Sequence, residues 1–125
     1  MELTLDVHKH PEATVVVAEG EIDLATTGDV RDTIGELIVD GDVHLVVDLQ
    51  KVSFLDSTGL GAFIGARRRA HAFKGSFSLV CTNESLMKIF RITGLDRVFD
   101  FYETQEAALA AAAEHREAAL AATGD

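Results

Sequence analysis

The run Val43–Leu49 places the tightest limit on how this chain can fold. Apart from one histidine and one aspartate it is apolar throughout, so it lacks the alternation of a strand with one face in water. Continuous apolar runs of this length are typical of strands that are buried on both faces. The run therefore predicts a strand in the centre of a sheet, and 125 residues suit a single domain built around it.

Two strands are expected before this central run. Leu3–His8 alternates apolar and polar residues, which is the period of a half-exposed strand. Pro11 ends that strand within a polar turn, and Ala13–Ala18 is a β-branched run typical of a more buried strand. Together they predict an opening β-hairpin.

A helix is expected between the hairpin and the central run. Gly20–Asp23 is interpreted as a loop that carries two carboxylates, and Asp23 or Thr26 can cap the helix after it. Thr26 with Asp29 resembles a capping box, and Gly41 ends the helix. The apolar stripe of this helix consists of residues three and four apart: Leu24, Thr27, Val30, Ile34, Leu37 and Ile38.

The rest of the chain continues the alternation of strands and helices. Gln50–Val52 is interpreted as a link between the central strand and the next motif. The expected helices run from Thr58 to Gly75, from Thr82 or Asn83 to Gly94, and onward from Thr104. The expected strands span 77–81 and 98–102. This order predicts an α/β domain with a mixed, mostly parallel sheet, an opening hairpin and four helices.

The domain is expected to occupy residues 1–115, with no linker and no internal repeat. Residues 116–125 form the end of an alanine-rich helix of high intrinsic propensity. The apolar stripe of that helix is thin, chiefly Leu109 with Ala112 or Ala113. Its end, from Glu117 onward, is expected to fray because it has little to pack against.

The net charge is −10, and this limits the partners that the chain can bind. Nucleic acid and anionic lipid both require a positive surface, so neither is expected as a partner. No apolar run approaches the ~18 residues that span a bilayer, and no signal peptide is evident. The single cysteine, Cys81, cannot form an internal disulfide, which fits a cytoplasmic location. An acidic module of this size is better suited to a protein partner.

The segment Asp56–Gly61 joins the end of a strand-like run to the start of a helix, and it concentrates a carboxylate, two hydroxyls and two glycines. A hydrolytic triad is poorly supported, since Ser57 follows an acid and lies outside a G-x-S-x-G elbow. A dinucleotide cradle is also poorly supported, because Gly65 falls one residue late for G-x-G-x-x-G and no G-K-[ST] follows.

Two other kinds of site are weak as well. The five histidines are scattered along the sequence, and only His8 and His10 are close together, so a metal site is not expected. A phosphoacceptor aspartate at Asp48 would need further acids and a lysine on a late strand, and 98–102 contains no lysine. The chain is therefore expected to need no cofactor and not to be an enzyme.

Capping and phosphorylation remain as the two interpretations of Asp56–Thr58. Asp or Ser at a helix start commonly accepts hydrogen bonds from unpaired N–H groups. Alternatively, Ser57 is an exposed hydroxyl that a kinase can modify, and the helix dipole with free N–H groups would tolerate a phosphate. A phosphate would add about −1.5 to −2 charges beside Asp56 and near Glu21 and Asp23, if that loop shares the same face.

The chain resembles the STAS-domain anti-sigma factor antagonists, which are small bacterial proteins of partner-switching modules. The resemblance extends over about residues 3 to 115, and D-S-T-G-L-G at the head of the second helix is its specific part. The motifs that carry it are Gly20–Asp23, Leu45–Leu49, Val52–Gly61, Gly94-Leu95 and Val98-Phe99. The resemblance implies the STAS fold.

The resemblance also implies a mechanism. The unphosphorylated antagonist binds an anti-sigma factor, a serine kinase of the histidine-kinase-like ATPase fold, and so frees the sigma factor. The kinase uses ATP and Mg²⁺ to phosphorylate Ser57, the phosphoprotein dissociates, and a PP2C-type phosphatase restores it. The implied binding residues, besides the helix that follows them, are Glu21, Asp23, Asp56, Ser57, Thr58, Gly59, Leu60 and Gly61. A STAS interaction module of a stress-signalling or transport-regulatory complex is the alternative.

Overall fold

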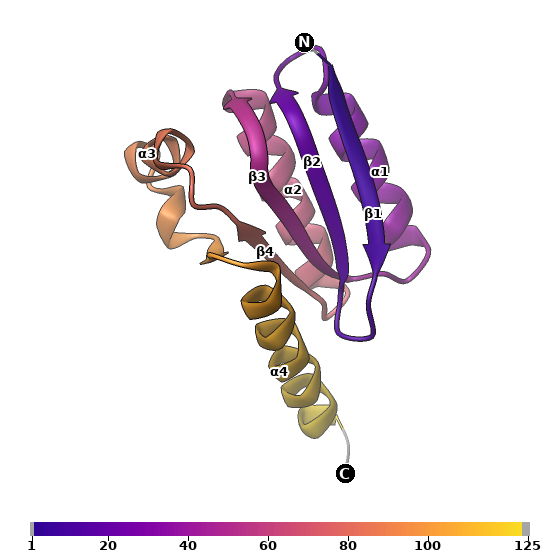
Figure 1. The fold of residues 1–125 in the computed structure, drawn as a ribbon. Coiled ribbons are helices and arrows are strands. Elements are labelled where there is room, and N and C mark those ends of the chain that lie inside the picture. The colour runs from indigo at the N-terminus through magenta and orange to yellow at the C-terminus, as the bar shows by residue number, and fades with distance from the viewer. Residues whose placement is uncertain (1, 124–125) are drawn as a thin grey trace.

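The computed structural model describes residues 2–123, and within them a five-stranded sheet forms the centre of the domain (Figure 1). The strands lie in sequence order: β1 (Leu3–Lys9), β2 (Thr14–Ile22), β3 (His44–Leu55), β4 (Ser76–Val80) and β5 (Asp100–Tyr102). β1 and β2 pair antiparallel, and every later neighbour pairs parallel. The predicted mixed sheet, opening hairpin and central position of β3 are confirmed.

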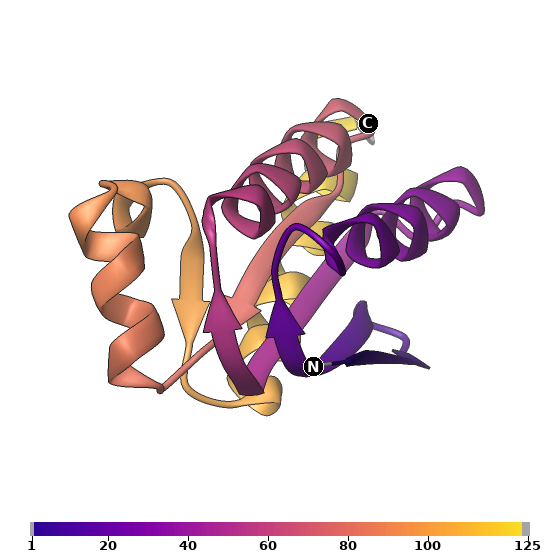
Figure 2. The ribbon, with the colours of Figure 1, turned by 90° about the horizontal axis from the view of Figure 1, so that it is seen from above.

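Helices cover both faces of this sheet (Figures 1 and 2). α1 (Thr27–Val39) and α2 (Ser57–Ala72) lie on one face, and α4 (Gln105–Thr123) lies on the other. α3 (Glu84–Ile92) stands beside β4 and β5, and the short 3₁₀ helix η1 (Leu95–Arg97) connects it to β5. Each βα unit is closed by its own helix, which is how parallel strands are normally joined.

The two faces of the sheet differ in how much apolar surface they bury. Alternate residues of β3 point to opposite sides, so Leu45 and Val47 face α1 and α2 whereas Val46 faces α4. The first face carries the larger core, which includes a chain of aromatic contacts through Phe63, Phe77, Phe99, Phe90 and Phe101. On the second face α4 contributes mainly two buried alanines, Ala108 and Ala112.

Strands β2 and β3 are longer than the sequence predicts. Glu21 pairs with Phe54 and Ile22 pairs with Leu55, after two register shifts between the strands. Gly20–Ile22 and Gln50–Val52, predicted as a loop and a link, are therefore strand. Gly20 has φ +121°, and a Cβ there would lie 2.1 Å from the backbone oxygen of Glu2, so this close approach of β1 and β2 requires glycine.

The helix ends also depart from the prediction in places. Leu24 precedes α1 and is 80% exposed, so its place in the apolar stripe was wrong, and Thr26 makes no side-chain capping bond. The prediction of Asn83 as the cap of α3 is confirmed, since its side chain accepts from two backbone N–H groups. β5 begins only at Asp100, because the chain forms η1 after Gly94.

α4 is helical to Thr123, and fraying of 117–125 stays a prediction, with residues 124 and 125 outside the described part of the chain. In the described part, none of the helices combines the length and the apolar character that crossing a bilayer demands.

Candidate functional site

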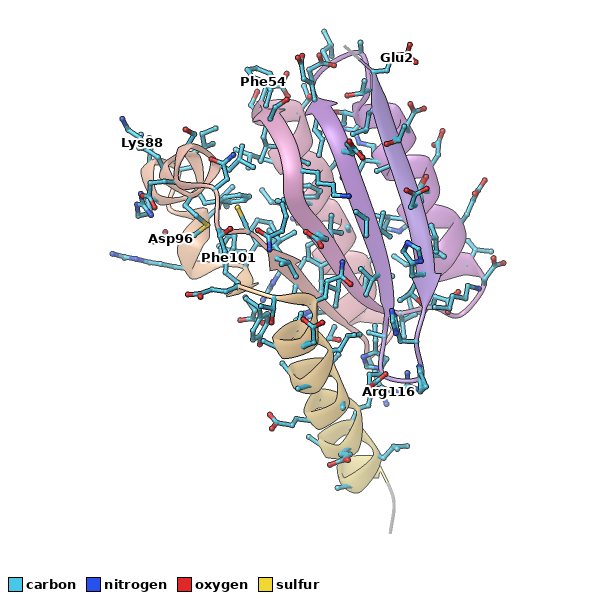
Figure 3. All side chains as sticks on the ribbon, in the orientation of Figure 1. Glu2, Phe54, Lys88, Asp96, Phe101 and Arg116 are labelled. Atoms are coloured by element: carbon cyan, nitrogen blue, oxygen red, sulfur yellow. The ribbon has the colours of Figure 1, made fainter. Side chains whose placement is uncertain are left out.

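The candidate site lies where β2 and β3 end side by side and α2 begins. The backbone N–H of Asp56 donates to the carbonyl oxygen of Ile22 at 3.2 Å, which ties the start of α2 to the end of β2. Figure 3 shows Phe54, at the end of β3, near this end of the sheet. The fold therefore brings residues 20–23 and the segment Asp56–Gly61 to the same edge, a proximity that the sequence left open.

Asp56 is the residue that organises this edge. It is the N-cap of α2, and its Oδ1 accepts from the N–H groups of Thr58 at 2.9 Å and Gly59 at 3.3 Å. The Thr58 hydroxyl also donates to Oδ1 at 2.5 Å. That hydroxyl, followed by the N–H groups of Gly59, Thr58 and Leu24, lowers the pKa of Asp56 against the opposing effect of desolvation. Asp56 is therefore a carboxylate at neutral pH and also holds the loop before α1.

The loop itself is braced by its own hydrogen bonds. Asp23 Oδ1 accepts from the N–H groups of Ala25 at 2.9 Å and Thr26 at 3.1 Å. The buried Thr26 hydroxyl donates to the Glu21 carbonyl at 2.7 Å and accepts from the Asp23 N–H at 2.9 Å. These bonds give the backbone from Glu21 to Thr26 a defined shape.

A hydroxyl pair joins the two helix starts. Thr27 Oγ1 at the start of α1 lies 2.8 Å from Thr58 Oγ1 in α2, and Thr27 is only 2% exposed. The relative position of α1 and α2 at this edge is thus fixed by a buried polar contact. Sequence reasoning assigned Thr27 to an apolar stripe and missed this role, for which two successive threonines after a loop are the only sequence signal.

Gly59 and Gly61 differ in their surroundings. A Cβ on Gly59 would lie 2.5 Å from Leu55 Cδ1 and 2.7 Å from Ile22 Cγ2, so a side chain cannot fit between α2 and the strand ends. No atom lies within 4 Å of a Cβ built on Gly61, which is exposed. Gly59 and Leu60 are therefore buried beneath the exposed surface of α2, whereas Gly61 lies on that surface.

Ser57 is the first residue of α2 and is exposed. Glu21, Asp23, Asp56 and Thr58 are partly exposed around it. The expectation of free N–H groups for a phosphate was wrong in part, because Asp56 already accepts from two of the N–H groups at this helix start. A phosphate on Ser57 would compete with Asp56 for them, and the two like charges would repel.

Two exposed apolar residues at this edge were not singled out from the sequence. Leu24 is 80% exposed and Phe54 is 48% exposed. Leu24 follows Asp23 in the braced loop, and Phe54 stands two residues before Asp56 on β3. A partner protein that covered these side chains would remove apolar surface from water, which favours association.

The alternative chemistries gain no support from the geometry. In residues 2–123 no group of three or more His, Cys, Asp or Glu is arranged to hold a metal ion. Asp48, considered as a phosphoacceptor, is 7% exposed and accepts from Gln105 Nε2 at 2.6 Å and from the Gln50 N–H at 2.9 Å. Asp48 thus fastens the start of α4 to the sheet.

The fold and the site define a small α/β domain. Its candidate site is an exposed surface where β2 and β3 end and α2 begins, rather than an enclosed pocket. The chain belongs to the STAS family: the model of the STAS domain matches residues 4–108. It is 33% identical over 106 residues to the anti-sigma-B factor antagonist of Bacillus subtilis, covering 85% of this chain and 96% of that protein.

Solved structures agree with this assignment. An anti-sigma factor antagonist from Mycobacterium paratuberculosis superposes with a TM-score of 0.79 at 30% identity, covering 89% of this chain and 94% of that one. The Bacillus cell fate determinant SpoIIAA in its phosphorylated form superposes with a TM-score of 0.67 at 25% identity, covering 85% of this chain and 96% of that one. The predicted STAS fold is confirmed.

Proposed function

We propose that this protein is an anti-sigma factor antagonist whose binding state is set by phosphorylation of Ser57. The observation that carries the proposal is the exposed hydroxyl at the first residue of α2, held in a fixed frame by Asp56 and the braced loop. The relative from Bacillus subtilis is named as an antagonist of this kind, and SpoIIAA has been solved in a phosphorylated form.

In the unphosphorylated state, Ser57 and the exposed apolar pair Leu24 and Phe54 form the centre of the surface that meets the anti-sigma factor. Apolar side chains near the middle of an interface contribute much of the binding energy when water is excluded from them. Binding of the antagonist to the anti-sigma factor frees the sigma factor.

In the phosphorylated state, about −1.5 to −2 charges are added directly beside the Asp56 carboxylate. A partner surface that fits the neutral hydroxyl then meets a charge that it must desolvate without a counter-ion, which is costly. The complex dissociates for that reason. The anti-sigma factor is itself the serine kinase, of the histidine-kinase-like ATPase fold, and a PP2C-type phosphatase removes the phosphate.

The decisive experiment is phosphorylation of the purified protein by a candidate anti-sigma factor kinase with ATP and Mg²⁺. One phosphate is expected in the intact mass, and Ser57→Ala should abolish it. Ser53→Ala is the matched control, since Ser53 is an exposed serine nearby on β3 and should leave the reaction intact. Full-rate modification of the Ser57→Ala variant would refute the assignment.

A binding titration tests the surface separately. Leu24→Asp is expected to weaken anti-sigma factor binding by about tenfold or more, because it places a charge at an apolar contact. Val39→Asp is the matched control, since Val39 is equally exposed at 80% but lies at the far end of α1. Equal losses for the two variants would mean that the loss is a general charge effect and that Leu24 is outside the interface.

A further inference from the structure

Three of the five histidines meet at the end of the sheet opposite Ser57, although they are far apart in sequence. His44 begins β3, His71 lies in the last turn of α2, and His115 lies in α4. The His115 ring centroid is 5.8 Å from that of His44 and 6.4 Å from that of His71. His44 Nδ1 also lies 2.9 Å from Ser76 Oγ. The sequence shows these histidines as scattered, whereas the fold brings the three rings into contact; His44 is partly buried, and His71 and His115 are exposed.

This histidine cluster sits at the junction between α4 and the rest of the domain. The apolar contacts of α4 come from the buried Ala108 and Ala112, each of which contributes a single methyl group, and from the partly buried Leu109. Its polar attachments include Gln105 to Asp48 at one end and Arg116 Nη1 to the Glu12 carbonyl, at 3.4 Å, further along. Figure 3 shows Arg116 at the lower edge of the sheet. A helix held by so little apolar surface depends strongly on its polar contacts.

The surroundings of the cluster are mostly cationic. Burial, followed by Arg116 and His115, lowers the pKa of His44. Burial, followed by Arg67 and His115, lowers the pKa of His71, and Asp100 opposes this effect. Lys74 shares a surface groove with His44 and Arg116. The acidic groups near this junction are Asp100 on β5 and Glu114 on α4, both of which act on Tyr102.

We propose that His44, His71 and His115 form a pH-sensitive latch: α4 is held on the sheet while the His44 and His71 rings are neutral and is released when those two rings are protonated. Protonation of His44 and His71 would add a positive charge on each ring that contacts His115, beside Arg116 and Arg67 respectively. Release moves His115 and Arg116 away together and so removes the repulsion. It also uncovers the apolar strip Val15, Val46 and Val80 on the second face of the sheet.

The direction of the pH effect follows from linkage. His44 and His71 have lower pKa values in the docked state than their ordinary 6.5, so the released state binds more protons. The docked state is therefore fully favoured above pH 6.5 and loses stability as the pH falls from there toward the docked pKa values.

Fluorescence of Tyr102 can report the release of α4 from the sheet. Tyr102 is the only tyrosine, no tryptophan is present, and Tyr102 packs against the cluster that contains Ala108 and Ala112. Its fluorescence should change in one step on titration from pH 8 to pH 5. Backbone hydrogen exchange in 105–123, corrected for intrinsic rates, should accelerate about tenfold for each pKa unit that separates the docked and released states. Amides of β3 should stay protected.

The variant His115→Gln should weaken both changes, because it removes the ring of α4 that contacts His44 and His71. His115→Gln can also loosen α4 at every pH. The quantity to compare is therefore how steeply the exchange rate of 105–123 changes with pH, not the exchange rate at one pH. The matched control is the double variant His8→Gln/His10→Gln, whose histidines are exposed in and after β1 and should leave the step unchanged. A flat profile in the wild type, a step of undiminished size in His115→Gln, or loss of β3 protection at the same pH would each overturn the proposal.

Discussion

The two ends of the sheet attach helices in different ways. At the carboxyl ends of β2 and β3, α2 is seated through a glycine contact with no spare room, and Asp56 and Thr27 hold the adjoining loop and helix. At the opposite end, α4 is attached through alanines, a few polar bonds and three histidines. The first arrangement presents one hydroxyl in a fixed geometry. The second, in the proposed latch, would let α4 leave without disturbing the larger core beneath α1 and α2.

The most sensitive position in this comparison is Gly59. Gly59→Val should lower the free energy of unfolding by about 3 kcal/mol, at the upper end of the cost of overpacking. The reason is that the new side chain would collide with Ile22 and Leu55, which are 0% and 2% exposed and cannot move aside. Chemical denaturation measures the effect.

The control for this prediction is Gly61→Ala in the same helix. Its Cβ enters open space, so it should stabilise the protein by up to about 1 kcal/mol through helix propensity. Similar losses for Gly59→Val and Gly61→Ala would show that α2 is not seated by the Gly59 contact.

Gln105 tests how α4 is attached to the sheet. Gln105→Leu removes the bond to Asp48 Oδ2 and leaves a buried carboxylate with fewer partners, so a loss of about 1–2 kcal/mol is expected. Hydrogen exchange should speed up in α4 and remain unchanged at Ser57. Glu106→Leu, which changes an exposed neighbour, is the control. Faster exchange across the whole sheet would contradict the view that α4 is a separable unit.

The order of strands and helices could be predicted because each element carries its own hydrophobic period. The ends of β2 and β3 could not be predicted in this way, since Gly20–Ile22 and Gln50–Val52 show little strand period of their own. They become strand through the pairing of β2 with β3, as in Gly20 with Val52 and Glu21 with Phe54. Long-range pairing overrides local composition in such segments. A polar linker and a solvated strand end look alike in one sequence.

The candidate site shows the same limit. Asp56 and Ser57 could be predicted because capping chemistry is local to the helix start. Leu24 fits a three-residue interval with Thr27, yet the Asp23 and Thr26 hydrogen bonds form a loop there and turn Leu24 outward. His44, His71 and His115 are distant in sequence, so only the fold could show that they meet.

Thr27 tests the carboxyl end of β2 and β3, and a smaller loss of stability is expected there. Thr27→Val should cost about 1 kcal/mol, the typical value of one buried hydrogen bond, because Thr58 keeps its bond to Asp56. A double-mutant cycle with Thr58→Val should give a coupling energy of similar size. Thr33→Val, a partly exposed threonine in the same helix, is the control. Zero coupling would mean that the two hydroxyls lie close without stabilising the edge.

The smallest expected effect belongs to Asp56→Asn, because asparagine also caps helices well and only the charge is lost. The hydroxyl of Thr58 and the nearby N–H groups lower the pKa of Asp56 below its ordinary 3.8, so the folded state favours the ionised form. The extra stability of the wild type is therefore present at neutral pH and lost as the pH falls below 3.8 through the folded pKa.

Denaturation of the wild type and of Asp56→Asn at pH 7 and near pH 3 should show that the difference between their free energies of unfolding shrinks. A constant difference for Asp56→Asn would mean that geometry rather than charge holds the Leu24 loop, and then phosphorylation of Ser57 could act on the partner without disturbing that loop.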